Sequence, residues 1–127
     1  EFDSNRIDFT GRVPYDEVTK QYARADVFVH PAVWPEPFGR TVTEAMQAGL
    51  PVVSTDVGGP ANVVPQPELR CPPEDPKALA DAIERAADDA AAIGEHNREY
   101  VNAEYAPENV VPRIVDVYDR VRETNRG

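Results

Sequence analysis

The sequence is poor in the residues that build disulfides, metal sites and membrane spans. It has one cysteine, Cys71, and two histidines, His30 and His96, which lie far apart in the chain. A single cysteine excludes an internal disulfide and a multi-cysteine metal site, and the histidines show no ligand spacing. No apolar run approaches the ~20 residues that a helix needs to cross a bilayer. We therefore expect a globular protein without a metal site, with Cys71 as a small buried residue at a strand end.

Positive charge is also scarce. The chain has 13 lysines and arginines against 23 acids, for a net charge of −10, and its only lysines are Lys20 and Lys77. Phosphate contacts dominate the affinity of proteins for nucleic acids, so this balance argues against a nucleic-acid partner. A small ligand that carries phosphate would have to be held by local backbone dipoles and particular basic residues.

What the sequence does have is a regular alternation of apolar runs with glycine and proline. Short runs that are typical of strands lie at 7–10, 26–30, 51–55 and 68–71. Helical periodicity predicts one turn at 61–64 and longer helices at 15–25, 38–48, 77–92, 94–104 and 107–123. This order predicts an α/β fold, a Rossmann-like parallel sheet flanked by helices, in a single partial domain over residues 1–127. Ligands in such sheets bind beyond the carboxyl ends of the strands, which selects the loops at 11–14, 31–40 and 56–60.

The loop at 31–40 leads into the most informative stretch of the chain. A loop carboxylate, Glu36, precedes Gly39, a helix start and a second carboxylate, Glu44. Gly39 lets a ligand approach the backbone closely, and a helix N-terminus offers free N–H groups to a diphosphate. Glu44 could accept hydrogen bonds from vicinal hydroxyls. Glu36 precedes the helix start and would lie beside the group that is attached to the diphosphate. One site could thus hold phosphate, ribose and sugar hydroxyls.

A structural role explains the same residues without a ligand. Thr41 and Glu44 match a capping box, in which Thr41 is the N-cap and Glu44 the third helical residue. Glu36 alone would then be a solvated loop acid. The two interpretations differ in where the helix begins: near residues 38–40 for the ligand site, and at Val42 for the cap.

Residues 36–53 resemble the E-x7-E region of family 4 of the GT-B glycosyltransferases. Both glutamates have the family's spacing, and the adjoining Pro-Phe-Gly, Glu-Ala-Met and Gly-Leu-Pro-Val-Val match as well. Four further blocks fit in order, at 11–14, 25–29, 55–60 and 75–80. The likeness covers roughly residues 7–121. It implies the C-terminal, donor-binding half of a GT-B fold, with the first βα unit missing.

The resemblance implies a role for each matching residue of the motif. Glu44 binds the ribose hydroxyls of a nucleotide-sugar donor. Glu36 contacts the donor hexose and supports charge build-up at the anomeric centre. Backbone N–H groups for sugar and diphosphate come from Phe38, Gly39 and Arg40, continued by Thr41 or Val42.

The flanking loops receive roles in the same way. Arg12 and Val13 lie against the base, mostly through backbone, although Arg12 is equally explained as a surface residue in a turn. Gly58 and Gly59 border the sugar pocket or serve as plain turn glycines. The implied reaction retains anomeric configuration and needs no metal or cofactor; the donor is a UDP-, GDP- or ADP-sugar, and the acceptor is not given.

Other implications concern what a GT-B enzyme has and this sequence lacks. The family's Arg–Lys pair for the diphosphate and its N-terminal, acceptor-binding domain are absent, so we expect the chain alone to be inactive. The helix at 107–124 is expected to pack toward that absent domain, or its apolar stripe against a second copy in a homodimer. We expect a cytoplasmic protein, with any peripheral membrane contact through the missing domain.

Two alternatives from other classes remain at this point. The first is a non-catalytic module that binds or scaffolds a nucleotide sugar. The second is another GT-B-like enzyme, an epimerase or a phosphorylase, although the former lacks this glutamate pair. The latter needs a lysine for a pyridoxal cofactor, and neither Lys20 nor Lys77 stands in a suitable motif.

Overall fold

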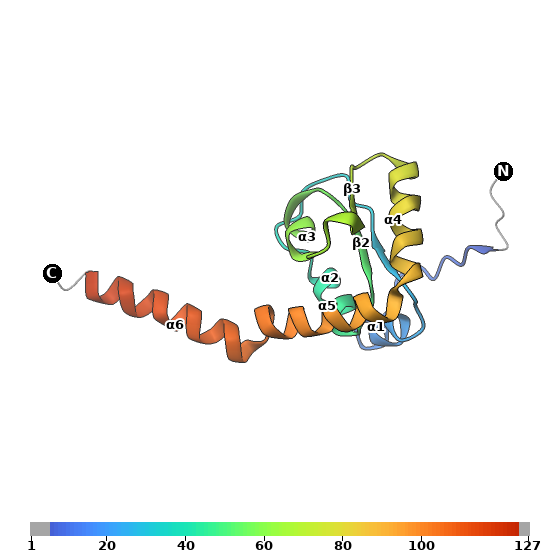
Figure 1. Ribbon diagram of the computed structural model, residues 1–127. Helices are drawn as coiled ribbons and strands as arrows, with labels where there is room; N and C mark the ends of the chain where they lie inside the picture. The colour runs from blue at the N-terminus through green and yellow to red at the C-terminus, as the bar shows by residue number, and fades with distance from the viewer. Residues whose placement is uncertain (1–5, 125–127) are drawn as a thin grey trace.

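The computed structural model describes residues 6–124 and contains a three-stranded parallel sheet with helices around it (Figure 1). The strands are β1 (Phe28–His30), β2 (Val52–Thr55) and β3 (Arg70–Cys71), in the order β1-β2-β3. Phe28 pairs with Val52, and Ser54 with Arg70. The predicted fold class, a parallel sheet flanked by helices, is confirmed.

The helices lie on both sides of this sheet. Their bounds are α1 Tyr15–Tyr22, α2 Arg40–Gln47, α3 Gly58–Val63, α4 Pro76–Asp88, α5 Ala90–Tyr105 and α6 Pro107–Thr124, with a 3-10 turn, η2, at Pro67–Leu69. In Figure 1, α4 stands on one side of the strands, and α2 and α3 lie on the other. α5 packs along α2. The sequence predicted each of the α-helices, although α3 only as one turn, because a helical period or a nearby proline or glycine marks them. It did not predict η2.

The core is centred on β2, whose four residues are all buried. A continuous apolar strand covered on both faces is what a parallel sheet requires. Val42 and Met46 of α2 fill one side and are fully buried, as is Leu69 just before β3. Burying a side chain of this size contributes about 1.5–3 kcal/mol. The apolar face of α2 therefore fixes the direction of the helix, and with it the position of Glu44.

Local residues determine where α2 ends and where α4 begins. Gly49 follows α2 at a φ of +84°, and the N–H of Leu50 returns to the carbonyl of Ala45 at 3.1 Å. This left-handed residue is the usual end of a helix, and glycine adopts it without strain. At α4, the Asp75 carboxylate accepts from the N–H of Ala78 at 2.9 Å, and Pro76 is the first helical residue.

Several sequence-based boundaries were wrong, among them the break expected between the helices at 77–92 and 94–104, which lies at Asp89. Residues 7–10 form no strand, and Ile7 and Phe9 are 42% and 87% exposed, because no neighbouring strand pairs with them in the described residues. The helical turn expected at 61–64 begins earlier, at Gly58, so that Gly58 and Gly59 are helical rather than loop residues. The strand expected at 68–71 is only Arg70–Cys71, because η2 occupies the residues before it.

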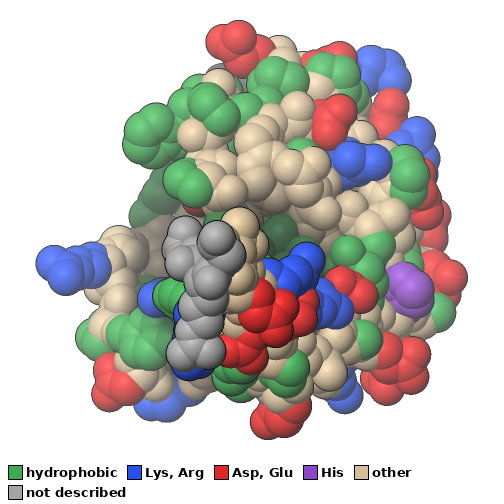
Figure 2. Space-filling view, turned by 90° about the vertical axis from the view of Figure 1, so that its left-hand side faces the viewer, with side chains coloured by type: hydrophobic (Ala, Val, Ile, Leu, Met, Phe, Trp, Pro, Cys, Tyr) green, Lys and Arg blue, Asp and Glu red, His purple; other side chains and the backbone are tan. Residues whose placement is uncertain are grey.

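The last helix, α6, extends away from the rest of the molecule (Figure 1). None of its residues is buried. Figure 2, seen toward the C-terminal end of α6, shows acidic and basic side chains beside one another around this helix. Six apolar side chains on α6 are each at least 49% exposed: Val111, Ile114, Val115, Val117, Tyr118 and Val121. The helix itself was predicted; what it packs against stays a prediction. No described helix, α6 included, combines the length and the apolar character needed to cross a membrane.

Candidate functional site

The start of α2 decides between the two interpretations of the motif. The helix begins at Arg40, and Gly39 is its N-cap with a φ of +83° and no side-chain cap. Thr41 is therefore the second helical residue and caps nothing, so the capping-box alternative is wrong. The left-handed conformation of Gly39, the residue before Arg40, is one that only glycine adopts without strain. The observed start is the one that the ligand interpretation requires.

The backbone at this helix start leaves N–H groups that the helix itself does not use. The first residues of any helix lack an internal acceptor, and their N–H groups carry partial positive charge. The N–H of Val42 donates to the carbonyl of Gly39 at 3.0 Å, and the Val42 side chain is fully buried. Of the two residues expected to extend the cradle, Thr41 is the one whose N–H makes no backbone hydrogen bond in the described chain.

Phe38 and Arg40, on either side of Gly39, point their side chains in different directions. The Phe38 ring packs edge-on against Tyr105, with 5.4 Å between ring centroids. The Arg40 guanidinium lies over the Tyr15 ring, 5.3 Å from its centroid, and its Nε is 3.1 Å from Glu44 Oε1. The Arg40 side chain is 73% exposed, so its position can change at little cost.

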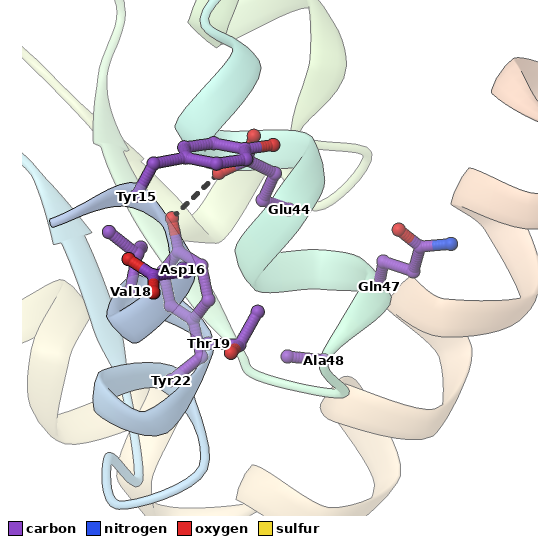
Figure 3. Close-up of a pocket in the computed structure, with 8 residues that line it drawn as sticks. All are labelled: Tyr15, Asp16, Val18, Thr19, Tyr22, Glu44, Gln47 and Ala48. Atoms are coloured by element: carbon purple, nitrogen blue, oxygen red, sulfur yellow. Dashed lines mark hydrogen bonds between the residues drawn. The ribbon is translucent and has the colours of Figure 1, made fainter.

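Glu44 is held by two partners. Its Oε1 pairs with Arg40, and its Oε2 accepts from the Tyr22 hydroxyl at 3.2 Å (Figure 3). Tyr22 reaches Glu44 from α1 and is only 7% exposed. Burial, then the negative charge of Glu44, raises the pKa of the Tyr22 phenol to about 12. The hydroxyl therefore keeps its proton at neutral pH and acts as a donor to Glu44.

Glu44 also lines two clefts, one on each side of α2. The first, about 410 Å³, lies between α1 and α2 and is shown in Figure 3. Its lining residues are Tyr15, Asp16, Val18, Thr19, Tyr22, Glu44, Gln47 and Ala48. The second, about 500 Å³, lies between α2 and the α5–α6 junction and includes Tyr105 and Asn102. Of the predicted site residues, Glu44 alone lines either cleft.

Glu36 lies in the loop between β1 and α2, next to the end of the sheet. Its carboxylate Oε1 is 3.2 Å from Nε2 of His30, the last residue of β1. The His30 side chain is 14% exposed, and its buried Nδ1 has no hydrogen-bond partner in the described chain. The loop is anchored to β2, because the Thr55 hydroxyl donates to the carbonyl of Ala32 at 2.6 Å.

Gly58 and Gly59, at the start of α3, lie against the backbone of the same loop. The N–H of Gly59 donates to the carbonyl of Glu36 at 2.7 Å. A Cβ on Gly58 would lie 2.8 Å from the Glu36 backbone, and one on Gly59 would collide with Pro37. Both residues are assigned to the start of α3, and Gly58 has the positive φ, +66°, that a turn glycine adopts without strain. Their lack of a side chain allows the loop that carries Glu36 to pack against this helix.

Arg12 and Val13 are less closely joined to the site. They precede α1, whose N-cap is Pro14, and Arg12 is exposed. Neither makes a hydrogen bond to the motif in the described residues, and the lining of the α1–α2 cleft begins at Tyr15. The structure thus places them near the α1 edge of the cleft without a contact that assigns a role.

Sequence reasoning missed Tyr22 and His30. Tyr22 was predicted only as a residue of the helix at 15–25, and His30 only as lacking metal-ligand spacing. The signals were present: a buried tyrosine hydroxyl needs a partner, and His30 ends a strand, where ligand sites of parallel sheets lie.

Comparison with known proteins identifies the family. The model of the family described as glycosyl transferases group 1 matches residues 3–106 of this chain. The chain belongs to this family. The predicted glycosyltransferase family and its GT-B fold are thus confirmed, which makes the chain part of a family of transferase enzymes.

Individual relatives agree with this assignment. A Bacillus subtilis protein named as a glycosyltransferase, YtcC, is 32% identical over 123 residues, which cover 92% of this chain and 30% of that protein. Sucrose-phosphate synthase from Thermosynechococcus elongatus is 33% identical with a TM-score of 0.79, covering 94% of this chain and 31% of the synthase. HepE of Anabaena, solved in complex with UDP, is 26% identical with a TM-score of 0.77, covering 92% of this chain and 33% of HepE. The chain spans about a third of the length of these proteins.

Proposed function

We propose that this chain is the donor-binding part of a retaining glycosyltransferase that moves a hexose from a nucleoside-diphosphate sugar to an acceptor. One observation carries the proposal: α2 begins at Arg40 behind the left-handed Gly39, and the same short helix presents Glu44 at the wall of a cleft. A site for an anion and a site for hydroxyls are therefore built on one rigid element. The family membership and the UDP in HepE support a nucleotide ligand.

The nucleoside lies in the cleft between α1 and α2. At about 410 Å³ this cleft is of the size that holds small ligands. Tyr15 offers an exposed ring on which a base can lie, and Glu44 meets the ribose. An ionised carboxylate has about four acceptor sites, of which the Tyr22 hydroxyl occupies one. At least two remain for the hydroxyls of a ribose diol, whether Arg40 stays paired with Glu44 or turns away.

The diphosphate lies at the N-terminus of α2. Unused N–H groups at Gly39, Arg40 and Thr41, together with the helix dipole, stabilise its charge despite the net charge of −10. The Arg40 guanidinium is exposed and can turn from Glu44 toward the phosphates, where a fork of N–H donors binds well.

The sugar lies beside Glu36. The carboxylate is partly exposed, and the loop is held by bonds from Gly59 and Thr55. A carboxylate held in this way contacts hexose hydroxyls and stabilises the positive charge that develops at the anomeric carbon as the diphosphate leaves. His30 fixes its orientation. No metal or cofactor enters this proposal.

The remaining parts of the reaction are assigned outside this chain. The acceptor site and the basic pair for the diphosphate belong to other segments of the enzyme, so this chain alone binds donor without turnover. The exposed apolar stripe of α6 packs against such a segment or, as the alternative, against a second copy of the chain in a homodimer. The enzyme is cytoplasmic, and any peripheral membrane contact lies in those other segments.

Calorimetric titration of the chain with UDP, GDP and ADP tests the proposal. We expect one of the three to bind more tightly than the others, and Glu44→Gln to weaken that binding about tenfold, because a ribose hydroxyl loses a charged acceptor. Glu99→Gln, on an exposed part of α5, is the matched control and should bind as the wild type. Absence of binding by the wild type at several millimolar, or equal binding by Glu44→Gln, would refute the assignment.

A further inference from the structure

The two partners of Glu44 differ sharply in burial. Tyr22 is 7% exposed and lies against Phe28, with 5.8 Å between the ring centroids. The Arg40 side chain is 73% exposed. A buried partner cannot move without disturbing the packing around it, whereas an exposed arginine exchanges its contacts with solvent readily. Of the two contacts of Glu44, the hydrogen bond from Tyr22 is thus more persistent than the ion pair with Arg40.

Tyr22 also comes from a different element than Glu44. The hydroxyl on α1 and the carboxylate on α2 are 22 residues apart in sequence, so their contact joins the two walls of the α1–α2 cleft. Figure 3 shows both side chains meeting at the cleft, with Tyr15 beside Glu44 at its upper edge. A glutamate has three rotatable side-chain bonds, and without a fixed partner its carboxylate would sample several orientations.

We propose that Tyr22 is a positioning residue for the nucleotide: its hydroxyl holds one oxygen of Glu44 so that the remaining acceptor sites face a ribose diol. This inference rests on the proposed function, since it assigns Glu44 to the ribose. Tyr22 lines the cleft, but its hydroxyl is taken up by Glu44 and acts on the ribose through that carboxylate. Tyr22 holds Oε2 while Oε1 pairs with the exposed Arg40, so the carboxylate keeps one fixed partner when Arg40 moves.

The substitution Tyr22→Phe removes one oxygen atom and keeps the ring, so it isolates this hydrogen bond. The test titrates UDP, GDP and ADP and their 2′,3′-dideoxy counterparts into the wild type, Tyr22→Phe, Glu44→Ala and the double variant. Tyr118→Phe, whose ring is 67% exposed on α6, is the matched control. Circular dichroism verifies that each variant is folded.

We expect Tyr22→Phe to weaken the ribonucleotides that bind by about fivefold, all by the same factor, as for the loss of one hydrogen bond. The dideoxy ligands should lose less than about twofold, because they present no diol to Glu44. The loss should vanish in the Glu44→Ala background. A partly unfolded variant would weaken both ligand types alike, so the ratio between them reports positioning and not stability.

The outcomes separate this inference from the proposed function. Equal affinities of Tyr22→Phe and wild type, or an equal loss for ribo and dideoxy ligands, overturn the positioning role while Glu44 keeps its own. If Glu44→Ala binds all ligands as the wild type does, or if the wild type binds none, the ribose site itself is wrong.

Discussion

Replacing Gly39 by alanine tests whether the left-handed residue at the start of α2 is required by its surroundings. In the folded chain Gly39 has a φ of +83°, and a Cβ built there lies 2.6 Å from Pro60 Cγ and 3.1 Å from Pro60 Cβ. Pro60 is buried in α3, so neither side can withdraw easily. An alanine at this position therefore meets both a strained backbone and a steric clash.

The magnitude follows from the two costs. A non-glycine residue in the left-handed region costs about 1–2 kcal/mol, and overpacking of a well-filled site adds about 1–3 kcal/mol. Gly11 provides the matched control, because its φ is +64° and a Cβ there meets nothing within 4 Å. Gly11→Ala should carry the backbone cost alone. We expect Gly39→Ala to lower the free energy of unfolding by about 1–3 kcal/mol more than Gly11→Ala does.

Urea denaturation followed by far-ultraviolet circular dichroism measures both variants against the wild type. The gain in unfolded-state order on replacing glycine is the same in the two variants and cancels in the comparison. Equal destabilisation of the two variants would show that Pro60 does not confine Gly39 and that steric contact does not determine the start of α2. Pro60→Ala in the Gly39→Ala background should recover part of the loss.

Three further predictions concern other residues. His30→Phe should weaken binding of a nucleotide sugar but not of the bare nucleoside diphosphate in calorimetry, since it removes the imidazole nitrogen that lies 3.2 Å from Glu36. His30→Gln should restore part of the affinity, and equal effects on both ligands would contradict this. Asn97→Leu should cost about 2–4 kcal/mol of stability in urea, because the buried Asn97 donates to the carbonyl of Leu50 and accepts from Gln66. The free energy of unfolding should fall between pH 10 and 12, because the folded Tyr22 keeps a proton that the unfolded chain loses near its ordinary pKa of 10.0; this fall should be smaller in Tyr22→Phe, and identical pH profiles would contradict it.

The sequence predicted the elements whose signals are local. β2 and α2 were found because an apolar run, the helical period of Val42 and Met46, and the pair Gly49 and Pro51 all lie within a few residues of each other. The motif itself was placed at the correct end of the sheet, because the strands of a parallel sheet carry their ligand sites at one edge. The capping box is also a local pattern, formed by Thr41 and Glu44, so it could be stated beforehand as an alternative that the helix start would decide.

The features that the sequence did not predict depend on segments that are distant along the chain. A strand at 7–10 needs a neighbour to accept its hydrogen bonds, and an apolar run alone does not supply one. The contacts of Tyr22 with Glu44 and of Gly59 with Glu36 join residues more than 20 positions apart, and they arise from how α1 and α3 pack. The pairing of His30 with Glu36 depends on the course of a proline-rich loop that has no periodic signal.

The absence of buried residues on α6 affects how the chain unfolds locally and how fast its amides exchange with solvent. Amides in a cooperative core exchange with solvent only on global unfolding, whereas a helix without a buried face opens by itself. Among the described residues, the first turns of α6 are tied to α5 through Asn109 with Asn102 and Arg113 with Glu104, and Pro112 removes one internal hydrogen bond. Helix formation without tertiary packing is only marginally favourable even at this length. The amides of Pro107–Thr124 should therefore exchange far faster than those of β2, and α6 forms a second, weaker folding unit at the edge of the domain.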